Sequence, residues 1–140
     1  EWLLYKESLF KYNEIKSFKN FYNDIKKHKK IFRDLLLNLK DMKKKVIGYG
    51  ASTKGNVILQ YCNINSKILP YIAEVNKFKH GRYTPGSNIK IISEGQARKM
   101  NPDFFLVLPW HFKSFILDKE KKFLNNNKKI IFPLPDIEIV

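Results

Sequence analysis

The 140-residue chain has a single cysteine, Cys62, and no hydrophobic run long enough to cross a membrane. One cysteine excludes an intrachain disulfide and a C-x-x-C metal site, which favours a reducing compartment. A membrane-spanning helix needs about 20 consecutive apolar residues, and no run approaches this length. The first residues, EWLLYKESLFKY, lack the features of a secretory signal peptide. We therefore expect a soluble, cytoplasmic protein without a membrane partner.

Arginine is scarce, although the formal net charge is +14. Only Arg33, Arg82 and Arg98 are arginines, and the other basic residues are lysines. Proteins that read bases or clamp phosphates through paired hydrogen bonds favour arginine. The basic residues are also spread over the chain rather than concentrated in one segment. We therefore expect a solvated lysine surface, and no nucleic-acid partner.

Hydrophobic residues make up 44% of the chain, and their pattern changes near Lys43. Upstream, apolar residues recur every three or four positions, which predicts helices with one apolar face. They are Ile15, Phe18, Tyr22, Ile25, Phe32, Leu36 and Leu39. We predict a helical segment over residues 1–44 that packs on a domain over residues 45–140. Its stripe is too long for one small domain, so we expect it to leave an apolar patch for another domain to cover.

Short apolar runs alternate with helical or loop segments after Lys45. The predicted strands are Val46–Tyr49, Ile68–Ala73, Phe104–Leu108 and Ile130–Phe132; the predicted helices are Val57–Cys62, Glu94–Met100 and His111–Leu124. This alternation favours a parallel sheet with helices on both faces. We predict an α/β fold, with a Rossmann-like, mostly parallel sheet, flanking helices and a long N-terminal helical segment.

The stretch VIGYGASTKGNVILQYC, residues 46–62, places three glycines where the first strand meets the first helix. In an open α/β sheet the backbone of this turn approaches phosphate groups at the helix N-terminus. Gly48 and Gly50 remove side chains there, Ser52 or Thr53 can cap the helix, and Lys54 adds a cation.

The glycine spacing departs from two known phosphate-binding motifs. Thr53 stands where G-x-G-x-x-G requires its third glycine, and Asn56 follows Gly55 where a P-loop requires lysine. A P-loop NTPase is therefore excluded. Close packing of the helix on the strand is the alternative explanation for the glycines.

Three further residues belong to the same predicted rim of the sheet. Glu74 ends the second predicted strand, near where nucleotide-binding α/β domains place the carboxylate that accepts ribose hydroxyls. Trp110 and His111 follow the strand Phe104–Leu108. Trp110 can stack on a base or sugar and His111 can contact a phosphate, but packing or helix capping is the favoured explanation for the histidine. The glycine turn and Glu74 together favour a nucleotide over a bare phosphate.

Four ordered stretches of the chain carry a family resemblance: YGASTKGNVILQYC, IAEVNKFKHGRYTPGS, DFFLVLPWHFK and IIFPLPDIEIV. Together they resemble the C-terminal domain of S-adenosylmethionine-dependent sugar-nucleotide C-methyltransferases, which act in deoxysugar biosynthesis. The resemblance extends over essentially the whole chain. It implies a three-part protein: a cysteine-rich, zinc-binding N-terminal domain, a central domain that binds S-adenosylmethionine, and a Rossmann-like C-terminal domain.

The sequence has neither the zinc-ligand cysteines nor the acidic glycine-rich loop of the first two parts. The chain also begins without methionine, inside a helical pattern, so we expect a fragment that corresponds to the third part. The resemblance implies that a base in the central domain removes a proton beside a keto group of the sugar, and that the resulting enolate attacks the methyl group of S-adenosylmethionine. For this fragment we expect no activity alone, no catalytic residue, no metal and no cofactor of its own.

The resemblance implies that this domain helps to hold the nucleotide-sugar substrate beside the methyltransferase domain. The candidate residues carried onto this sequence are Gly48, Gly50, Ala51, Ser52, Thr53, Lys54 and Gly55 at the first turn, Glu74 and Asn76 after the second strand, and Tyr83, Thr84, Pro85 and Gly86 in the next loop. That loop, HGRYTPGS, has turn chemistry that suits a rigid connector equally well. The alternative function is a stand-alone nucleotide or nucleotide-sugar binding module without catalysis. A methyltransferase sequence upstream of Glu1 would decide between the two.

Overall fold

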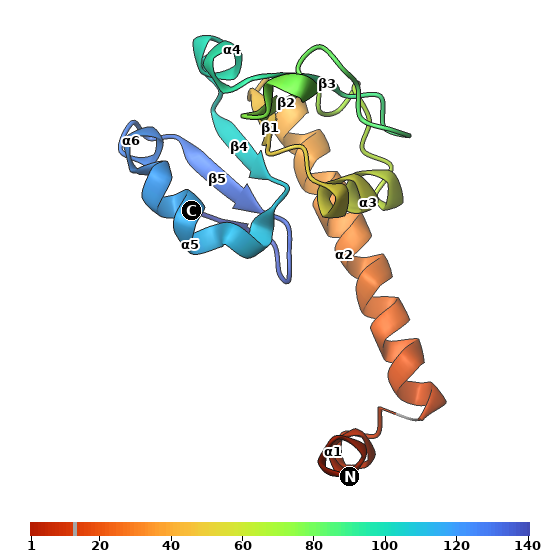
Figure 1. Ribbon diagram of the computed structural model, residues 1–140. Coiled ribbons are helices and arrows are strands. Elements are labelled where there is room, and N and C mark those ends of the chain that lie inside the picture. Colours follow the sequence, from red (N-terminus) through yellow and green to blue (C-terminus); the bar gives the residue numbers. More distant parts are fainter. Residues whose placement is uncertain (13) are drawn as a thin grey trace.

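The chain is built on one six-stranded sheet (Figure 1). The computed structural model describes residues 1–12 and 14–140. The strands are β1 Val46–Tyr49, β2 Tyr71–Glu74, β3 Lys90–Ser93, β4 Phe104–Val107, β5 Lys129–Phe132 and β6 Glu138–Ile139. Their order across the sheet is β3-β2-β1-β4-β5-β6. The first five pair in parallel and β6 runs antiparallel to β5, which confirms the predicted mostly parallel sheet.

Helices cover both faces of this sheet. They are α1 Trp2–Leu9, α2 Ile15–Asp41, α3 Thr53–Tyr61, α4 Glu94–Lys99, α5 Lys113–Lys119 and α6 Lys121–Leu124, with two 3₁₀ turns, η1 Lys77–Lys79 and η2 Trp110–Phe112. Successive strand residues point to opposite faces. In β4, Leu106 joins the core under α2 and α3, and Phe105 and Val107 join the core under α4, α5 and α6. Because both faces are buried, the strands read as continuous apolar runs.

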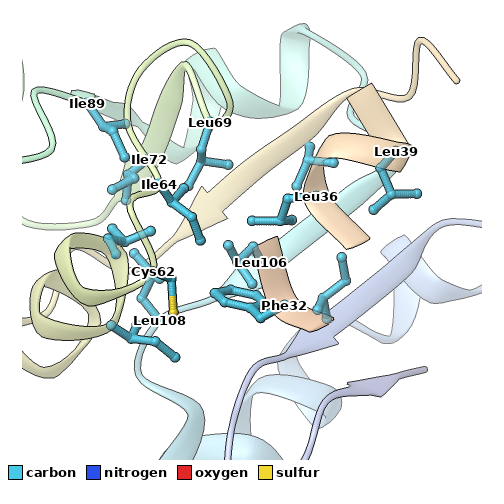
Figure 2. Packing of buried hydrophobic residues seen from close by; sticks show 14 residues of the cluster. Phe32, Leu36, Leu39, Cys62, Ile64, Leu69, Ile72, Ile89, Leu106 and Leu108 are labelled. Carbon is cyan, nitrogen blue, oxygen red and sulfur yellow. The ribbon is translucent and has the colours of Figure 1, made fainter. Parts of the chain in front are cut away.

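The C-terminal half of α2 packs on the sheet. Phe32, Leu36 and Leu39 are its buried residues, and Figure 2 places the first two beside Leu106 of β4. The Nε2 atom of His28 donates a hydrogen bond to the carbonyl oxygen of Pro133 over 2.6 Å. These contacts fix α2 along one face of the domain.

The other half of α2 projects away from the sheet, with α1 near its far end (Figure 1). This half of α2, α1 and the turn after α1 expose many large apolar side chains: Trp2, Leu3, Leu4, Tyr5, Leu9, Phe10, Tyr12, Ile15, Phe18, Phe21 and Tyr22. We call this set the N-terminal apolar surface. Two helices in residues 1–44 confirm the predicted helical segment, and the set includes the expected exposed apolar residues. No described helix is both long and apolar enough to cross a membrane.

Four of the described helices, α1 to α4, end in a left-handed turn of the kind most often made by glycine. After α1 this residue is Lys11, with φ of 56°; after α2, α3 and α4 it is Lys43, Asn63 and Asn101, with φ of 57°, 53° and 50°. After α3, the amide of Asn63 donates to Gln60 and that of Ile64 donates to Leu59, over 3.0 and 2.8 Å. These bonds satisfy the last carbonyl groups of the helix.

Three elements differ from the sequence prediction. The predicted helix His111–Leu124 is divided into η2, α5 and α6. The backbone leaves helical geometry at Glu120, with φ −99° and ψ 16°, where this side chain turns into the core. Strands β3 and β6 were not predicted, because β3 follows a connection without an α-helix and β6 has only two residues.

We expect Phe32→Ala to lower the free energy of unfolding by about 3–5 kcal/mol, because it leaves a cavity in the core under α2. Phe18→Ala is the matched control on the same helix, since Phe18 is 63% exposed. Thermal unfolding of the two variants measures the difference. An equal and small loss from both would show that α2 does not stabilise the domain.

Candidate functional site

A crevice opens at the carboxyl ends of β1, β2 and β4. The strand order reverses between β1 and β4: β2 and β3 follow on one side of β1, and β5 and β6 follow on the far side of β4. Ligands of open α/β sheets bind at such a reversal. The crevice has a volume of about 560 Å³. Tyr49 and Ala73 line it from the strand ends, and Val75, Phe112 and Phe115 line it from the loops and helices that follow. We call it the strand-end crevice.

A second cavity, of about 640 Å³, lies between α2, α3, η2 and residues 134–136. Its apolar lining includes Ile25, Val57, Tyr61 and Trp110, and Lys54 is among the charged residues around it. We call it the α2–α3 pocket. It is the larger of the two, but it lies on a helix-covered face, so the strand-end crevice is the better candidate for the ligand site of this fold.

The three glycines of the first turn have packing roles that do not require a ligand. A Cβ atom on Gly48 would lie 2.7 Å from Cγ1 of Ile72, and one on Gly55 would lie 2.5 Å from Cβ of Leu108. Gly50 has φ +81°, and its Cβ would lie 2.8 Å from the ring of Pro109. Gly48 and Gly55 therefore permit close packing, and Gly50 makes the turn itself.

The N-terminus of α3 opens at this turn. The Oγ atom of Ser52 accepts a hydrogen bond from the amide of Gly55 over 3.0 Å, as expected of an N-cap. Within residues 14–140, no protein oxygen accepts a hydrogen bond from the amides of Thr53 or Lys54. These two N–H groups can donate hydrogen bonds to an anion, and the positive end of the helix dipole attracts the same anion.

Glu74 closes the crevice on the β2 side. One carboxylate oxygen accepts hydrogen bonds from the amides of Val75 and Asn76, both over 2.9 Å. The other accepts from the amide of Ala51 over 3.0 Å and from Nζ of Lys79 over 3.3 Å. Burial alone would raise the pKa of Glu74, but these donors hold it below its ordinary value. The carboxylate therefore joins the loops after β1 and β2, and its oxygens already have protein partners.

A buried ionic network lies under the other side of the crevice. Glu120 is 2% exposed, and its carboxylate accepts two hydrogen bonds from the guanidinium of Arg98, over 2.7 and 3.0 Å. The hydroxyl of Tyr49 donates to the same carboxylate over 2.9 Å. Burial alone would raise the pKa of Glu120, but the hydrogen bonds from Arg98 and Tyr49 outweigh burial and hold this pKa below its ordinary value. Burial and the Glu120 carboxylate raise the pKa of Tyr49, which stays protonated.

Two lysines line the crevice, and neither was among the sequence candidates. Lys119 pairs with Glu94 over 2.8 Å, and its Nζ lies 5.2 Å from the centroid of the Tyr49 ring. Lys79 pairs with Glu74. The sequence offered one indication of charged contacts in this region. Glu94 and Arg98 lie four residues apart on one helix, a spacing that favours the ion pair they form.

The predicted first-turn residues are divided between the two cavities. Gly50, Ala51 and Ser52 line the strand-end crevice, as does Glu74. Lys54 lines the α2–α3 pocket. Gly48 and Gly55 are buried in packing, and Thr53 is exposed at the first turn of α3.

The remaining candidates lie around or away from these cavities. Trp110 lines the α2–α3 pocket, and His111 is exposed, with its ring 4.3 Å from that of Phe112. Asn76 caps η1 by accepting a hydrogen bond from the amide of Phe78 over 3.0 Å.

The loop after η1 is held by its own contacts. Thr84 is buried, and its Oγ1 accepts from the amide of Ile89 over 2.9 Å. Tyr83 is exposed. The carbonyl of Pro85 accepts from Gln60 over 3.0 Å, and Gly86 has φ +73°. These contacts support the connector explanation for the loop.

The comparisons with known proteins identify the family. The C-methyltransferase C-terminal domain family matches residues 1–135, and the chain belongs to this family. It is also similar to a C-methyltransferase, NovU, of Streptomyces niveus, with 37% identity over 97 residues. The matched segment is 69% of this chain and 23% of that relative. Among the described residues, no group of His, Cys, Asp and Glu is arranged to hold a metal ion.

We expect the Glu120 network to appear in the acid stability of the domain. The pKa of Glu120 is lower in the folded than in the unfolded chain, so its stabilisation is complete above pH 4.5 and is lost as the pH falls through the folded value. Glu120→Gln should destabilise the domain at neutral pH by about 2–3 kcal/mol, a figure reduced for the half-exposed Arg98. Below pH 4.5 this variant should lose stability less steeply than the parent.

Asp118→Asn is the control for this measurement, because Asp118 forms an exposed ion pair with Lys121 in the same region. Urea unfolding at several pH values compares the three proteins. If Glu120→Gln and Asp118→Asn had the same pH profile, the buried network would not contribute to acid stability.

Proposed function

We propose that this domain binds the nucleotide-sugar substrate of an S-adenosylmethionine-dependent C-methyltransferase that acts on a keto-deoxysugar nucleotide. One observation carries the proposal: the free amides of Thr53 and Lys54 open at the same turn as the strand-end crevice. Family membership supports the methyltransferase part. The shape of the crevice and its free donors support the nucleotide-sugar substrate that the family resemblance implies.

The apolar lining of the crevice, the N-terminus of α3 and the α2–α3 pocket suit different parts of such a ligand. Phe112, Phe115 and Val75 offer apolar surface for the flat ring of a base. The N-terminus of α3 suits a diphosphate, because its amides and dipole favour negative charge. Lys54 lies in the first turn of this helix, and its side chain supplies a cation from the side of the α2–α3 pocket. Trp110, in the same pocket, offers a stacking surface for the sugar.

The described residues do not fit S-adenosylmethionine. The first turn lacks the G-x-G-x-G spacing of a loop that binds this cofactor. Both oxygens of Glu74 already accept hydrogen bonds from Ala51, Val75, Asn76 and Lys79, so we do not propose Glu74 as the acceptor of ribose hydroxyls for any nucleotide. We therefore assign the methyl donor and the catalytic base to another domain of a longer chain. Any zinc that the whole protein holds is assigned to a separate, cysteine-rich N-terminal domain.

The N-terminal apolar surface supports contact with that methyltransferase domain. Contiguous exposed apolar patches often mark interaction sites. The exposed residues lie on α1, on the turn after it and on the half of α2 that leaves the sheet, so a domain placed there would contact both helices.

We expect Lys54→Ala to weaken the binding of thymidine diphosphate glucose roughly tenfold to a hundredfold. A charge-assisted hydrogen bond to phosphate contributes about 1.5–3 kcal/mol. Lys121→Ala should leave the affinity unchanged, because Lys121 pairs with Asp118 on an exposed surface. Calorimetry at two salt concentrations separates a specific contact from general attraction to lysines. Equal effects of the two substitutions would contradict the phosphate site at α3.

We also expect the 140-residue chain to transfer no methyl group and to bind S-adenosylmethionine only weakly. The reason is the missing acidic glycine-rich loop. Calorimetry at neutral pH tests this division of labour. Sub-micromolar binding of S-adenosylmethionine would contradict it.

A further inference from the structure

Lys79 is the lysine of the strand-end crevice that lies at the first turn. Its Nζ atom is 2.9 Å from the carbonyl oxygen of Ala51, the residue just before the N-cap of α3. Lys54 lies closer to α3 along the chain, but its side chain lines the α2–α3 pocket instead. The other lysine of the crevice, Lys119, is held against Glu94 and the Tyr49 ring. A ligand inside the crevice therefore meets Lys79 at the turn.

The Lys79 ammonium retains hydrogen-bonding capacity. It has three N–H groups and uses them for two protein contacts, with Ala51 and Glu74. Its side chain is 43% exposed, whereas that of Glu74 is 9% exposed. The crevice thus presents the ammonium rather than the carboxylate.

The Glu74 charge is also compensated from within the protein. The carboxylate accepts from three backbone amides in addition to Lys79. These amide dipoles stabilise the negative charge, so the ammonium does not have to neutralise it alone. An anion in the crevice can share the ammonium without leaving Glu74 unsatisfied.

We propose that Lys79 donates a hydrogen bond to the diphosphate of a nucleoside diphosphate held in the strand-end crevice. This inference rests on the proposed function and deepens it. The diphosphate would lie between the α3 N-terminus and Lys79, with Lys54 on the outer side. Lys79 is then a specificity-determining residue, because it distinguishes a phosphorylated nucleoside from a neutral one.

The test compares Lys79→Ala with Lys77→Ala in the 140-residue chain. Both residues belong to η1, but Lys77 is exposed and does not line the crevice. Thymidine diphosphate glucose and thymidine are the two probes, titrated by NMR at low and high salt. Lys79→Ala should weaken the diphosphate probe about tenfold and leave thymidine unchanged. Lys77→Ala should change neither, and Lys79→Arg should retain most of the affinity for the diphosphate probe.

Each other outcome has a distinct meaning. If Lys79→Ala weakens both probes equally, the residue only supports the fold of the crevice and the inference is overturned. If Lys79→Ala and Lys77→Ala behave alike while Lys54→Ala weakens the diphosphate probe, the inference is overturned and the proposed function stands. If the unmodified chain binds neither probe, the proposed function fails and the inference fails with it.

Discussion

The close approach of α3 to the sheet is the constraint on which the rest of the structure depends. Gly55 allows the helix to lie against Leu108, and Gly48 allows β1 to lie against Ile72. A side chain at Gly55 would push the start of α3 away from β4, and with it the two free amides at the first turn. The same absence of side chains that looks like a ligand-binding motif is thus required for packing. The site exists because this packing brings a helix N-terminus to the end of the sheet.

The sequence predicted the centre of the sheet well, because β1, β4 and β5 are buried on both faces and read as apolar runs. It did not predict β3, whose four residues contain only two apolar positions, Ile91 and Ile92. It also joined α5 and α6 into one helix. The break at Glu120 depends on Tyr49 and on Arg98, which lies 22 residues earlier, and no local pattern reports such a contact.

The candidate site could be predicted in position but not in detail. Ser52 and the glycine turn were found from spacing, since caps and turns are local features. The partners of Glu74 were not found, because the 3₁₀ turn that brings Lys79 to Glu74 has no recognisable sequence pattern. Lys54 is next to the turn in sequence, but the direction of a helical side chain follows from the packing of its helix. Proximity along the chain therefore suggested a different lysine from the two, Lys79 and Lys119, that line the crevice.

The ends of α2, α3 and α4 are places where substitution could stabilise the domain further. Lys43, Asn63 and Asn101 adopt a left-handed backbone that glycine adopts without strain from a Cβ atom. The chain has only six glycines and uses none of them at these three positions. Glycine at each position would therefore relieve backbone strain and stabilise the end of the helix. None of the three positions lines the strand-end crevice. The fold can in this way be made more robust without altering the surface that meets a ligand.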